Sequence, residues 1–392
     1  MSDSSVPLTF DAIAVRDAEF PSLRETVYLN AAAVAPLPNR SRVAVEAFNG
    51  RRSRIGELDD SCFEEPLRRC REAAARLIGA DAGEIALGGN TSYGINLAAL
   101  GLPLEPGTSA LVSDREFPAN VYPWMGLRDR GVELEIAGVD ALGHPDEERL
   151  LERLERGGVS VFALSAVQFA SGYRADLARL GAACRRTGTY FVVDAIQALG
   201  QVPIDVGAMQ IDVLATGGHK WLCGPFGTGF AYVRRELHEV LRPRAIGWTA
   251  MQASADFAHL TDYRWEFLDD ARRFELGTLP FQDLMGFACS MELLLEVGVE
   301  RISAHLASLL EPLIAWLHHR PGVEMVSDLR PEHRSGIFCF RPPAAEVVFG
   351  ALREGGVHCV LREGAIRLSP HLYNTREDID LVMDILSSEM AD

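Results

Sequence analysis

The sequence lacks any apolar run that approaches the ~20 residues needed to cross a membrane. Its beginning, MSDSSVPLTFDAIAVRDAEF, also lacks a basic segment followed by an apolar one. Basic side chains are scarce, since 38 lysines and arginines face 55 aspartates and glutamates and the formal net charge is -17. Because this charge repels nucleic-acid phosphates and anionic lipids, and no local basic patch offsets it, we expect no nucleic-acid or membrane partner and a cytoplasmic location.

Cysteine is sparse and has no recognisable pattern. The seven cysteines are odd in number and far apart, and they show neither a CxxC motif nor the Cys/His spacing of a zinc site. They are Cys62, Cys70, Cys184, Cys223, Cys289, Cys339 and Cys359. We therefore expect reduced thiols and no metal centre, with cysteines that pack as small core residues rather than act as nucleophiles.

The length and the strand pattern predict an α/β protein with two compact units. A chain of 392 residues exceeds the ~100–200 residues of a usual domain. In the middle of the chain, short apolar runs alternate with helical patterns, as in a mostly parallel sheet covered by helices. The expected strands cover residues 110–114, 133–138, 159–167, 189–195, 211–216 and 229–234, and a helix is expected over 176–188.

After about residue 280 the pattern changes to two long helices, which are followed by short strands and further helices. The last helix is expected to start at Thr375, with Asp378 in the capping-box position. We expect a large α/β domain over residues 21–280 and a smaller α+β domain that combines 281–392 with 1–20.

The segment ATGGHKWLCGPFGTGF (215–230) places Lys220 just after a buried strand and between several glycines. Lysine is rarely buried unless it is paired or reactive, and glycines let a ligand approach the backbone closely. The segment matches neither a P-loop nor the dinucleotide motif GxGxxG. Its spacing alone leaves two interpretations open, a catalytic lysine or a surface turn that happens to contain one.

The run YFVVDAIQALG (190–200) ends a strand at Asp194 and places Gln197 three residues later. Ligands of open α/β sheets bind at the carboxyl ends of strands. Asp194 alone is explained better as a cap of the next helix. With Lys220 nearby, a buried carboxylate also suits a protonated pyridine nitrogen, which would supply its cationic partner.

The run ALGGNTSYGINLAAL (86–100) opens a helix after a Gly-Gly turn. Unpaired N–H groups and the positive end of the helix dipole suit a phosphate beside Thr91 and Ser92. A plain N-cap explains the same residues.

Together these motifs resemble the class V aminotransferase family of fold type I pyridoxal-phosphate enzymes, which includes cysteine desulfurases, selenocysteine lyases, kynureninases and isopenicillin epimerases. The resemblance runs from about Tyr28 to Asn374 and combines D-x-x-Q (194–197), HK (219–220) and RFELGT (273–278). It implies a large domain with a mostly parallel seven-stranded sheet, a smaller C-terminal α+β domain and a bound pyridoxal 5'-phosphate.

The resemblance also implies roles for the motif residues. Lys220 would form the Schiff base with the cofactor, Asp194 would pair with the pyridinium nitrogen, and Gln197 would donate to the phenolic oxygen. Thr91 and Ser92 resemble the phosphate ligands.

Further phosphate contacts are implied by the same resemblance. Thr278 is similar to a residue that the family supplies from a second subunit, so a homodimer with shared active sites is expected. The family usually carries a serine three residues before the lysine, where this chain has Gly217. Thr216 or His219 is expected to compensate for it.

Other positions lie where the family contacts its cofactor or substrate. Phe117 replaces a histidine that stacks on the cofactor ring, and phenylalanine can stack but cannot transfer a proton. Gln168 occupies the place of a polar group beside the phenolic oxygen, although a turn contact also explains it. Arg367, in the R-x-S-x-x-x-YNT signature, resembles the clamp for the substrate carboxylate. Arg362 either assists it or forms a surface ion pair, and Asn30 is expected to reach the active site.

For the reaction, the resemblance implies a small amino acid that passes through an external aldimine and a quinonoid, with Lys220 as the base. Elimination, transamination and epimerisation all start from this carbanion. Since Phe117 replaces the histidine, and Cys359 belongs to an expected strand rather than to a sulfur-accepting loop, we expect a desulfurase-like C–S or C–Se lyase. The alternatives are an aminotransferase, an epimerase and a non-catalytic protein that only binds the cofactor.

Overall fold

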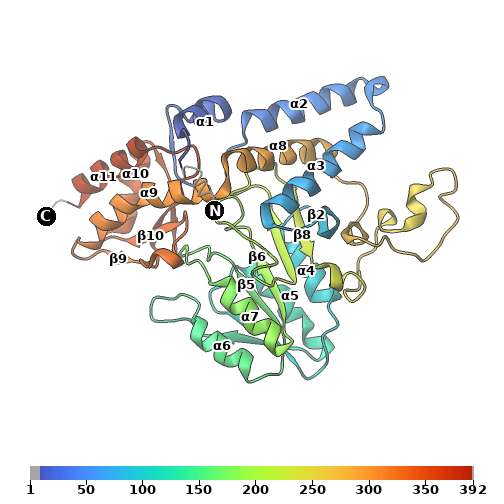
Figure 1. Cartoon of the computed structure of the whole chain (residues 1–392). Helices are drawn as coiled ribbons and strands as arrows, with labels where there is room; N and C mark the ends of the chain where they lie inside the picture. Colours follow the sequence, from blue (N-terminus) through green and yellow to red (C-terminus); the bar gives the residue numbers. More distant parts are fainter. Residues whose placement is uncertain (1–8, 391–392) are drawn as a thin grey trace, which may run out of the picture.

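The computed structural model describes residues 9–390, and its centre is a seven-stranded sheet in the order β2-β8-β7-β6-β5-β3-β4 (Figure 1). Strands β7, β6, β5, β3 and β4 are mutually parallel, whereas β8 is antiparallel to both of its neighbours. The bounds are β2 (Ile85–Gly88), β3 (Ser109–Ser113), β4 (Glu133–Ala137), β5 (Val159–Ser165), β6 (Tyr190–Asp194), β7 (Val213–Gly217) and β8 (Gly229–Val233). The α/β class and the mostly parallel seven-stranded sheet are confirmed.

All six strands predicted from the sequence lie in this sheet, within a few residues of their expected ends. The seventh strand, β2, was not predicted. It has four residues, lies at the edge of the sheet and pairs with β8. A run this short in front of a Gly-Gly turn carries too little periodicity to be recognised as a strand.

Helices cover both faces of the large sheet because side chains of each strand alternate between two hydrophobic clusters. In β6, Phe191 and Val193 enter one cluster and Val192 enters the other. The first face is covered by α3 (Ser61–Ile78), α6 (Glu147–Glu155), α7 (Leu177–Thr187) and α8 (Phe281–Val297), with α2 (Asn39–Ser53) packed on α8. The second face is covered by α4 (Thr91–Gly101) and the short α5 (Tyr122–Met125).

Helix α7 illustrates how local sequence sets these elements. The carboxylate of Asp176 accepts a hydrogen bond of 3.0 Å from the backbone N–H of Arg179 and caps the first turn. Leu177, Leu180 and Ala183 are buried on one side, and Gly188 ends the helix in the left-handed conformation (φ +70°). The helix predicted over residues 176–188 is therefore confirmed.

The C-terminal part contains a four-stranded antiparallel sheet in the order β12-β13-β10-β9. Its strands are β9 (Glu324–Met325), β10 (Phe338–Arg341), β12 (Val360–Arg362) and β13 (Ala365–Leu368), and its helices are α9 (Val299–His318), α10 (Ala345–Glu354) and α11 (Arg376–Glu389). The capping box between Thr375 and Asp378 is confirmed, since the Asp378 carboxylate accepts from the backbone N–H of Thr375 at 3.0 Å.

The N-terminal segment joins this part of the chain. Strand β1 (Val27–Tyr28) pairs in parallel with β11 (Val357–His358) after helix α1 (Ala12–Glu19), and the ring of Phe10 lies 4.9 Å from that of His305 in α9. Residues 1–8 lie outside the described residues. The division of the chain into domains at residue 280, with residues 1–20 in the smaller one, stays a prediction.

The segment that follows β8 extends away from the rest of the chain (Figure 1, yellow). A single bridge between Met251 and Phe267 closes it, and it exposes the large side chains of Phe257, Tyr263 and Trp265. Across residues 9–390, no helix combines the length and the apolar character that a membrane crossing requires.

The packing of α4 on the large sheet gives a stability prediction. A Cβ atom at Gly94 would lie 2.6 Å from Cβ of Ala215 and 3.1 Å from Cβ of Ala231. Because neither methyl group can move without shifting a strand, we expect Gly94→Ala to lower the free energy of unfolding by about 1–3 kcal/mol in urea titrations followed by circular dichroism.

The matched control is Gly50→Ala in α2, where a Cβ atom would meet nothing closer than 4.0 Å. This control should not lower the stability, because alanine favours a helix more than glycine does. Equal urea midpoints for Gly94→Ala and the wild-type chain would show that α4 is not held closely against β7.

Candidate active site

The parallel pairing of β6 and β7 places Asp194 and Lys220 at the same edge of the large sheet. Asp194 is the last residue of β6, and its register partner in β7 is Ala215. Lys220 follows three residues after the end of β7. Both residues therefore lie at the carboxyl ends of adjacent parallel strands, where open α/β sheets bind their ligands, and each charge affects the pKa of the other.

Burial drives both groups toward their neutral forms. Desolvation raises the pKa of Asp194 to about 7, although a 3.0 Å hydrogen bond from the backbone N–H of Ile196 and the charge of Lys220 act in the opposite direction. Desolvation lowers the pKa of Lys220 to about 8, and the nearby Arg367 and Arg362 lower it further, while Asp194 raises it. The amine is thus much closer to its nucleophilic, unprotonated form near neutral pH than an exposed lysine would be.

Lys220 is also the only lysine among all 392 residues. The other strongly basic side chains are all arginines. Arginine stays protonated in proteins and does not form imines under ordinary conditions. The chain therefore offers an aldehyde a single side-chain amine.

A second buried carboxylate, Glu116, lies near Asp194 and raises the pKa of that residue. Glu116 accepts hydrogen bonds from the backbone N–H of Ser165 (2.7 Å), from Nε2 of Gln168 (2.7 Å) and from Nδ2 of Asn120 (3.1 Å), and it contacts the hydroxyl of Ser165. Sequence reasoning missed Glu116. Its position directly after the strand that precedes Phe117 was the one available signal.

One aromatic ring lies beside the amine, and a second ring packs against the first. Nζ of Lys220 lies 5.6 Å from the ring centroid of Phe117, which is 39% exposed. The ring of Phe169 meets that of Phe117 edge-on at 5.3 Å. Phe117 therefore offers a flat apolar face close to Lys220, and Phe169, which the sequence did not single out, fixes its orientation.

The guanidinium of Arg367 on β13 is 1% exposed and only partly satisfied. Its Nη1 donates to the backbone carbonyl of Phe169 at 2.9 Å, but its Nε and Nη2 have no partner among residues 9–390. Burial lowers the pKa of Arg367 to about 10. Since a buried, unpartnered N–H group is costly, these two donors are suited to an anionic ligand.

Arg362 and Asn30 lie at the periphery of the same region. The guanidinium of Arg362 is 5.9 Å from the ring of Phe169, and no ion pair of Arg362 is present in the described part of the chain, so the alternative of a surface ion pair is not supported. Asn30 bridges to Ser369 through the backbone, and its Oδ1 has no partner within residues 9–390.

The start of α4 contributes one free hydroxyl group. The side chain of Asn90 caps the helix by accepting from the backbone N–H of Tyr93 at 3.0 Å, so the N-cap is real. Thr91 is buried and its Oγ1 has no partner among the described residues, whereas Ser92 is exposed. A capped helix with an unpartnered hydroxyl at its first residue leaves the phosphate interpretation open beside the capping one.

Thr216 and Gln197, which lie near Lys220, form hydrogen bonds within the chain. The hydroxyl of Thr216 is fully buried and donates to the carbonyl of Gly217 at 3.2 Å, and the expectation that it compensates for the missing serine stays a prediction. Gln197 donates from Nε2 to the carbonyl of Ala32 (3.1 Å) and accepts from Nε1 of Trp221 (2.8 Å), which leaves one N–H. His219 is half-buried, with its ring stacked on Phe226 at 5.5 Å.

Thr278 does not join this group. It is exposed and lines a separate cavity of about 750 Å³ together with Trp248, Phe257 and Phe281. No contact between Thr278 and Lys220 is present in the part of the chain that the structure describes.

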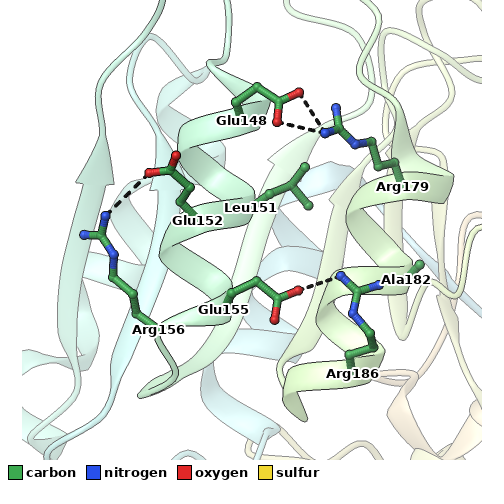
Figure 2. Close-up of a pocket in the computed structure, with 8 residues that line it drawn as sticks. All are labelled: Glu148, Leu151, Glu152, Glu155, Arg156, Arg179, Ala182 and Arg186. Atoms are coloured by element: carbon green, nitrogen blue, oxygen red, sulfur yellow. Dashed lines mark hydrogen bonds and ion pairs between the residues drawn. The ribbon is translucent and has the colours of Figure 1, made fainter.

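A second large hollow lies on the outer side of α6 and α7 and is unrelated to these residues. Figure 2 shows that its polar side chains bind one another: Arg179 pairs with Glu148 (2.7 Å), Arg186 with Glu155 (2.6 Å) and Arg156 with Glu152 (3.5 Å). Because each carboxylate has its own guanidinium, this hollow leaves no charge free for a ligand.

The seven cysteines form no disulfide with one another within residues 9–390, and six of them are buried while Cys289 is half-buried. Burial raises the pKa of Cys359 to about 12 and that of Cys339 also to about 12. Cys359 lies in the hydrophobic cluster of the smaller sheet. A thiol in such surroundings is a poor nucleophile.

Comparison with known proteins places this arrangement in a family. The sequence profile "Aminotransferase class-V" matches residues 27–382. A probable cysteine desulfurase of Methanothermobacter thermautotrophicus is 30% identical, over 94% of this chain and 96% of that protein. An isopenicillin N epimerase of Streptomyces clavuligerus is 29% identical, over 92% of this chain and 94% of that protein.

Solved structures agree on the fold. The complex between the cystine C–S lyase C-DES and its reaction product cysteine persulfide has a TM-score of 0.84 and 23% identity, and it covers 94% of this chain and 99% of that protein. At this identity the likeness supports the fold alone. The profile match and the relative at 30% identity carry the assignment further: the chain belongs to the class V aminotransferase family of pyridoxal-phosphate-dependent enzymes.

Proposed function

We propose that the chain is a lyase that cleaves the C–S or C–Se bond of a small amino acid with pyridoxal phosphate held by Lys220. The observation that carries the proposal is the placement of the only lysine, with a pKa of about 8, beside the buried carboxylate of Asp194. Relatives named cysteine desulfurase support the C–S chemistry.

The residues fit this cofactor. Asp194 would pair with the pyridinium nitrogen, and the face of Phe117 would cover the ring. The orphaned hydroxyl of Thr91 would bind the phosphate at the start of α4, assisted by Ser92 and His219. The remaining N–H of Gln197 and the amide of Gln168 would contact the phenolic oxygen.

When bound, the cofactor withdraws electrons from the α-carbon of the substrate. The residues of the chain supply the remaining chemistry. Arg367 binds the α-carboxylate through its two free N–H groups, so that the Cα–H bond faces Lys220. Nζ of Lys220 takes the α-proton, the thiolate or selenolate leaves with the electron pair of its bond to carbon, and water releases pyruvate and ammonia.

An internal sulfur acceptor is not part of the proposal, because the described cysteines are buried or half-buried and those near Arg367 have a raised pKa. Transamination stays the main alternative, since it uses the same lysine, aspartate and arginine. Epimerisation is favoured less, because Phe117 has no proton to deliver. A protein that binds the cofactor without turnover is the remaining alternative.

We further propose a homodimer in which Thr278 of each copy completes the phosphate site of the other. Its support is that Thr278 lies apart from Lys220 in its own chain, next to the extended segment with the exposed side chains of Tyr263 and Trp265. The cytoplasmic location and the lack of nucleic-acid and membrane partners stay predictions from the sequence.

The Schiff base can be tested by borohydride reduction, which converts it to a stable secondary amine. We expect one pyridoxyl group per chain, located by mass spectrometry on the peptide that contains Lys220, because no other side-chain amine competes. Lys220→Arg keeps the positive charge but cannot form the imine, so it should carry no internal adduct. An equal yield of adduct in Lys220→Arg would refute the proposal.

The pH dependence of cofactor loading tests the environment of the amine. Only the unprotonated amine attacks an aldehyde, so the rate at which the apo form acquires its chromophore should rise with pH and level off above about 8, the pKa of Lys220. Since the charge of Asp194 raises that pKa, Asp194→Asn should move the midpoint to lower pH. A rate that keeps rising through pH 10, as for an exposed lysine, would contradict the burial of the amine.

The reaction type can be read from products. With cysteine as substrate we expect pyruvate, ammonia and sulfide in equal amounts, without any requirement for a keto acid. Cys359→Ala should change kcat/KM by less than about twofold, because the thiol takes no part in the chemistry. Amino-group exchange that needs a keto acid would indicate an aminotransferase, and an unchanged cofactor spectrum with every amino acid would indicate a binding protein. Loss of sulfide release in Cys359→Ala would instead indicate a desulfurase that forms a persulfide on Cys359.

A further inference from the structure

A small cavity lies beside Gln168, and arginine dominates its walls. Its volume is about 40 Å³, and its lining includes Arg115, Arg341 and Arg362 with Glu363 as the one acidic residue. In a chain with a net charge of -17, a cavity in which arginines outnumber acids three to one is unusual. Clefts lined by one sign of charge concentrate ligands of the opposite sign.

Two of these guanidinium groups are free to bind a ligand. Arg341 pairs with Glu324 at the surface. Within residues 9–390, by contrast, neither Arg115 nor Arg362 has a carboxylate at ion-pair distance. The net charge available inside the cavity is therefore positive even when Glu363 is counted.

The position of Arg115 depends on a glycine. A Cβ atom at Gly143 would collide with Nη1 of Arg115 and lie 3.0 Å from its Cζ, so the guanidinium rests directly against the backbone there. Gly143 adopts a left-handed conformation (φ +83°) that a side chain would strain, and Arg115 itself has a φ of +60° at the end of β3. The chain thus accommodates one strained backbone conformation, at Arg115, and one that only glycine adopts readily, at Gly143, where this guanidinium borders the cavity.

The cavity borders the candidate active site through two shared residues. Gln168 lines it, and the amide of this residue is held by Glu116. Arg362 lines it as well, and its charge lowers the pKa of both Lys220 and Arg367. A substrate whose α-carboxylate binds Arg367 can therefore extend its side chain past Gln168 toward Arg115.

We infer that this cavity binds an anionic group at the far end of the substrate side chain, so that the substrate is an S-substituted cysteine that ends in a second carboxylate. The inference rests on the proposed function, since Arg367 is taken to hold the first carboxylate. Cleavage follows the same balance: Lys220 takes the α-proton, the Cβ–S bond breaks, and the substituent leaves as a thiolate that carries its own carboxylate. Arg115 and Arg362 would bind that carboxylate through charge-assisted hydrogen bonds.

A matched pair of ligands tests whether a second carboxylate on the substrate side chain contributes to binding. S-carboxymethyl-cysteine and S-carbamoylmethyl-cysteine have nearly the same shape and differ in whether the terminal group is a carboxylate or a neutral amide. Their dissociation constants can be measured at constant salt from the absorbance of the cofactor in the holoenzyme. We expect the carboxylate to bind at least about tenfold more tightly than the amide, and Arg115→Gln to remove most of this ratio.

The control variant is Arg42→Gln, because Arg42 lies on the exposed surface of α2 and pairs with Glu46. It should leave the ratio of the two dissociation constants unchanged. A ratio near one in the wild-type holoenzyme, or a ratio that survives in Arg115→Gln, would overturn the inference while leaving the lyase intact. If neither ligand nor cysteine alters the absorbance of the cofactor, the proposed function fails as well.

Discussion

The candidate site depends on one electrostatic constraint, the desolvation of a buried carboxylate and a half-buried amine that lie near the ends of two adjacent parallel strands. Asp194 and Lys220 are brought together by the register of β6 and β7, so any slip of that pairing would separate them. Desolvation raises the pKa of Asp194 and lowers the pKa of Lys220, so burial favours the uncharged form of each. The charge of either residue only partly offsets the desolvation of the other. In the proposed function, the cationic ring nitrogen of the cofactor would stabilise the charged carboxylate of Asp194 and leave the amine of Lys220 free for covalent chemistry.

The rest of the site is organised by the short segment 168–169, which links the large sheet to the smaller one. The amide of Gln168 donates to Glu116, which lies at the carboxyl ends of β3 and β5 in the large sheet. The carbonyl of Phe169 accepts from Arg367 on β13, and its ring contacts Phe117. Because one segment contacts the ring of Phe117, the carboxylate of Glu116 and the guanidinium of Arg367, a displacement of the smaller sheet would move that guanidinium relative to Phe117.

The sequence predicts features that depend on neighbouring residues, but not features that depend on contacts between residues far apart in the chain. Lys220 and Asp194 each follow a strand that local pattern reveals, so their meeting at one edge of the sheet could be predicted. Glu116 was missed because its role rests on Gln168, which is 52 residues away, and the unsatisfied donors of Arg367 become visible only once its bond to Phe169, 198 residues away, is known. Thr216 was assigned from its place in the motif, and the bond from its hydroxyl to the carbonyl of Gly217 could not be read from the sequence.

The distribution of basic residues adds a chemical reason for the selectivity of the site. A reactive aldehyde forms imines with any accessible primary amine, and surface lysines usually compete for it. In this chain all basic side chains other than histidine, except Lys220, are arginines, which bind carboxylates and phosphates strongly but do not form the imine under ordinary conditions. The lowered pKa of Lys220 further favours its reaction with an aldehyde, because more of the amine is unprotonated near neutral pH. The one other primary amine of the chain with a comparable pKa is the N-terminal α-amino group. Charge recognition and covalent chemistry are thus assigned to different residue types, so that the arginines around the cavity can attract anionic ligands without trapping the cofactor.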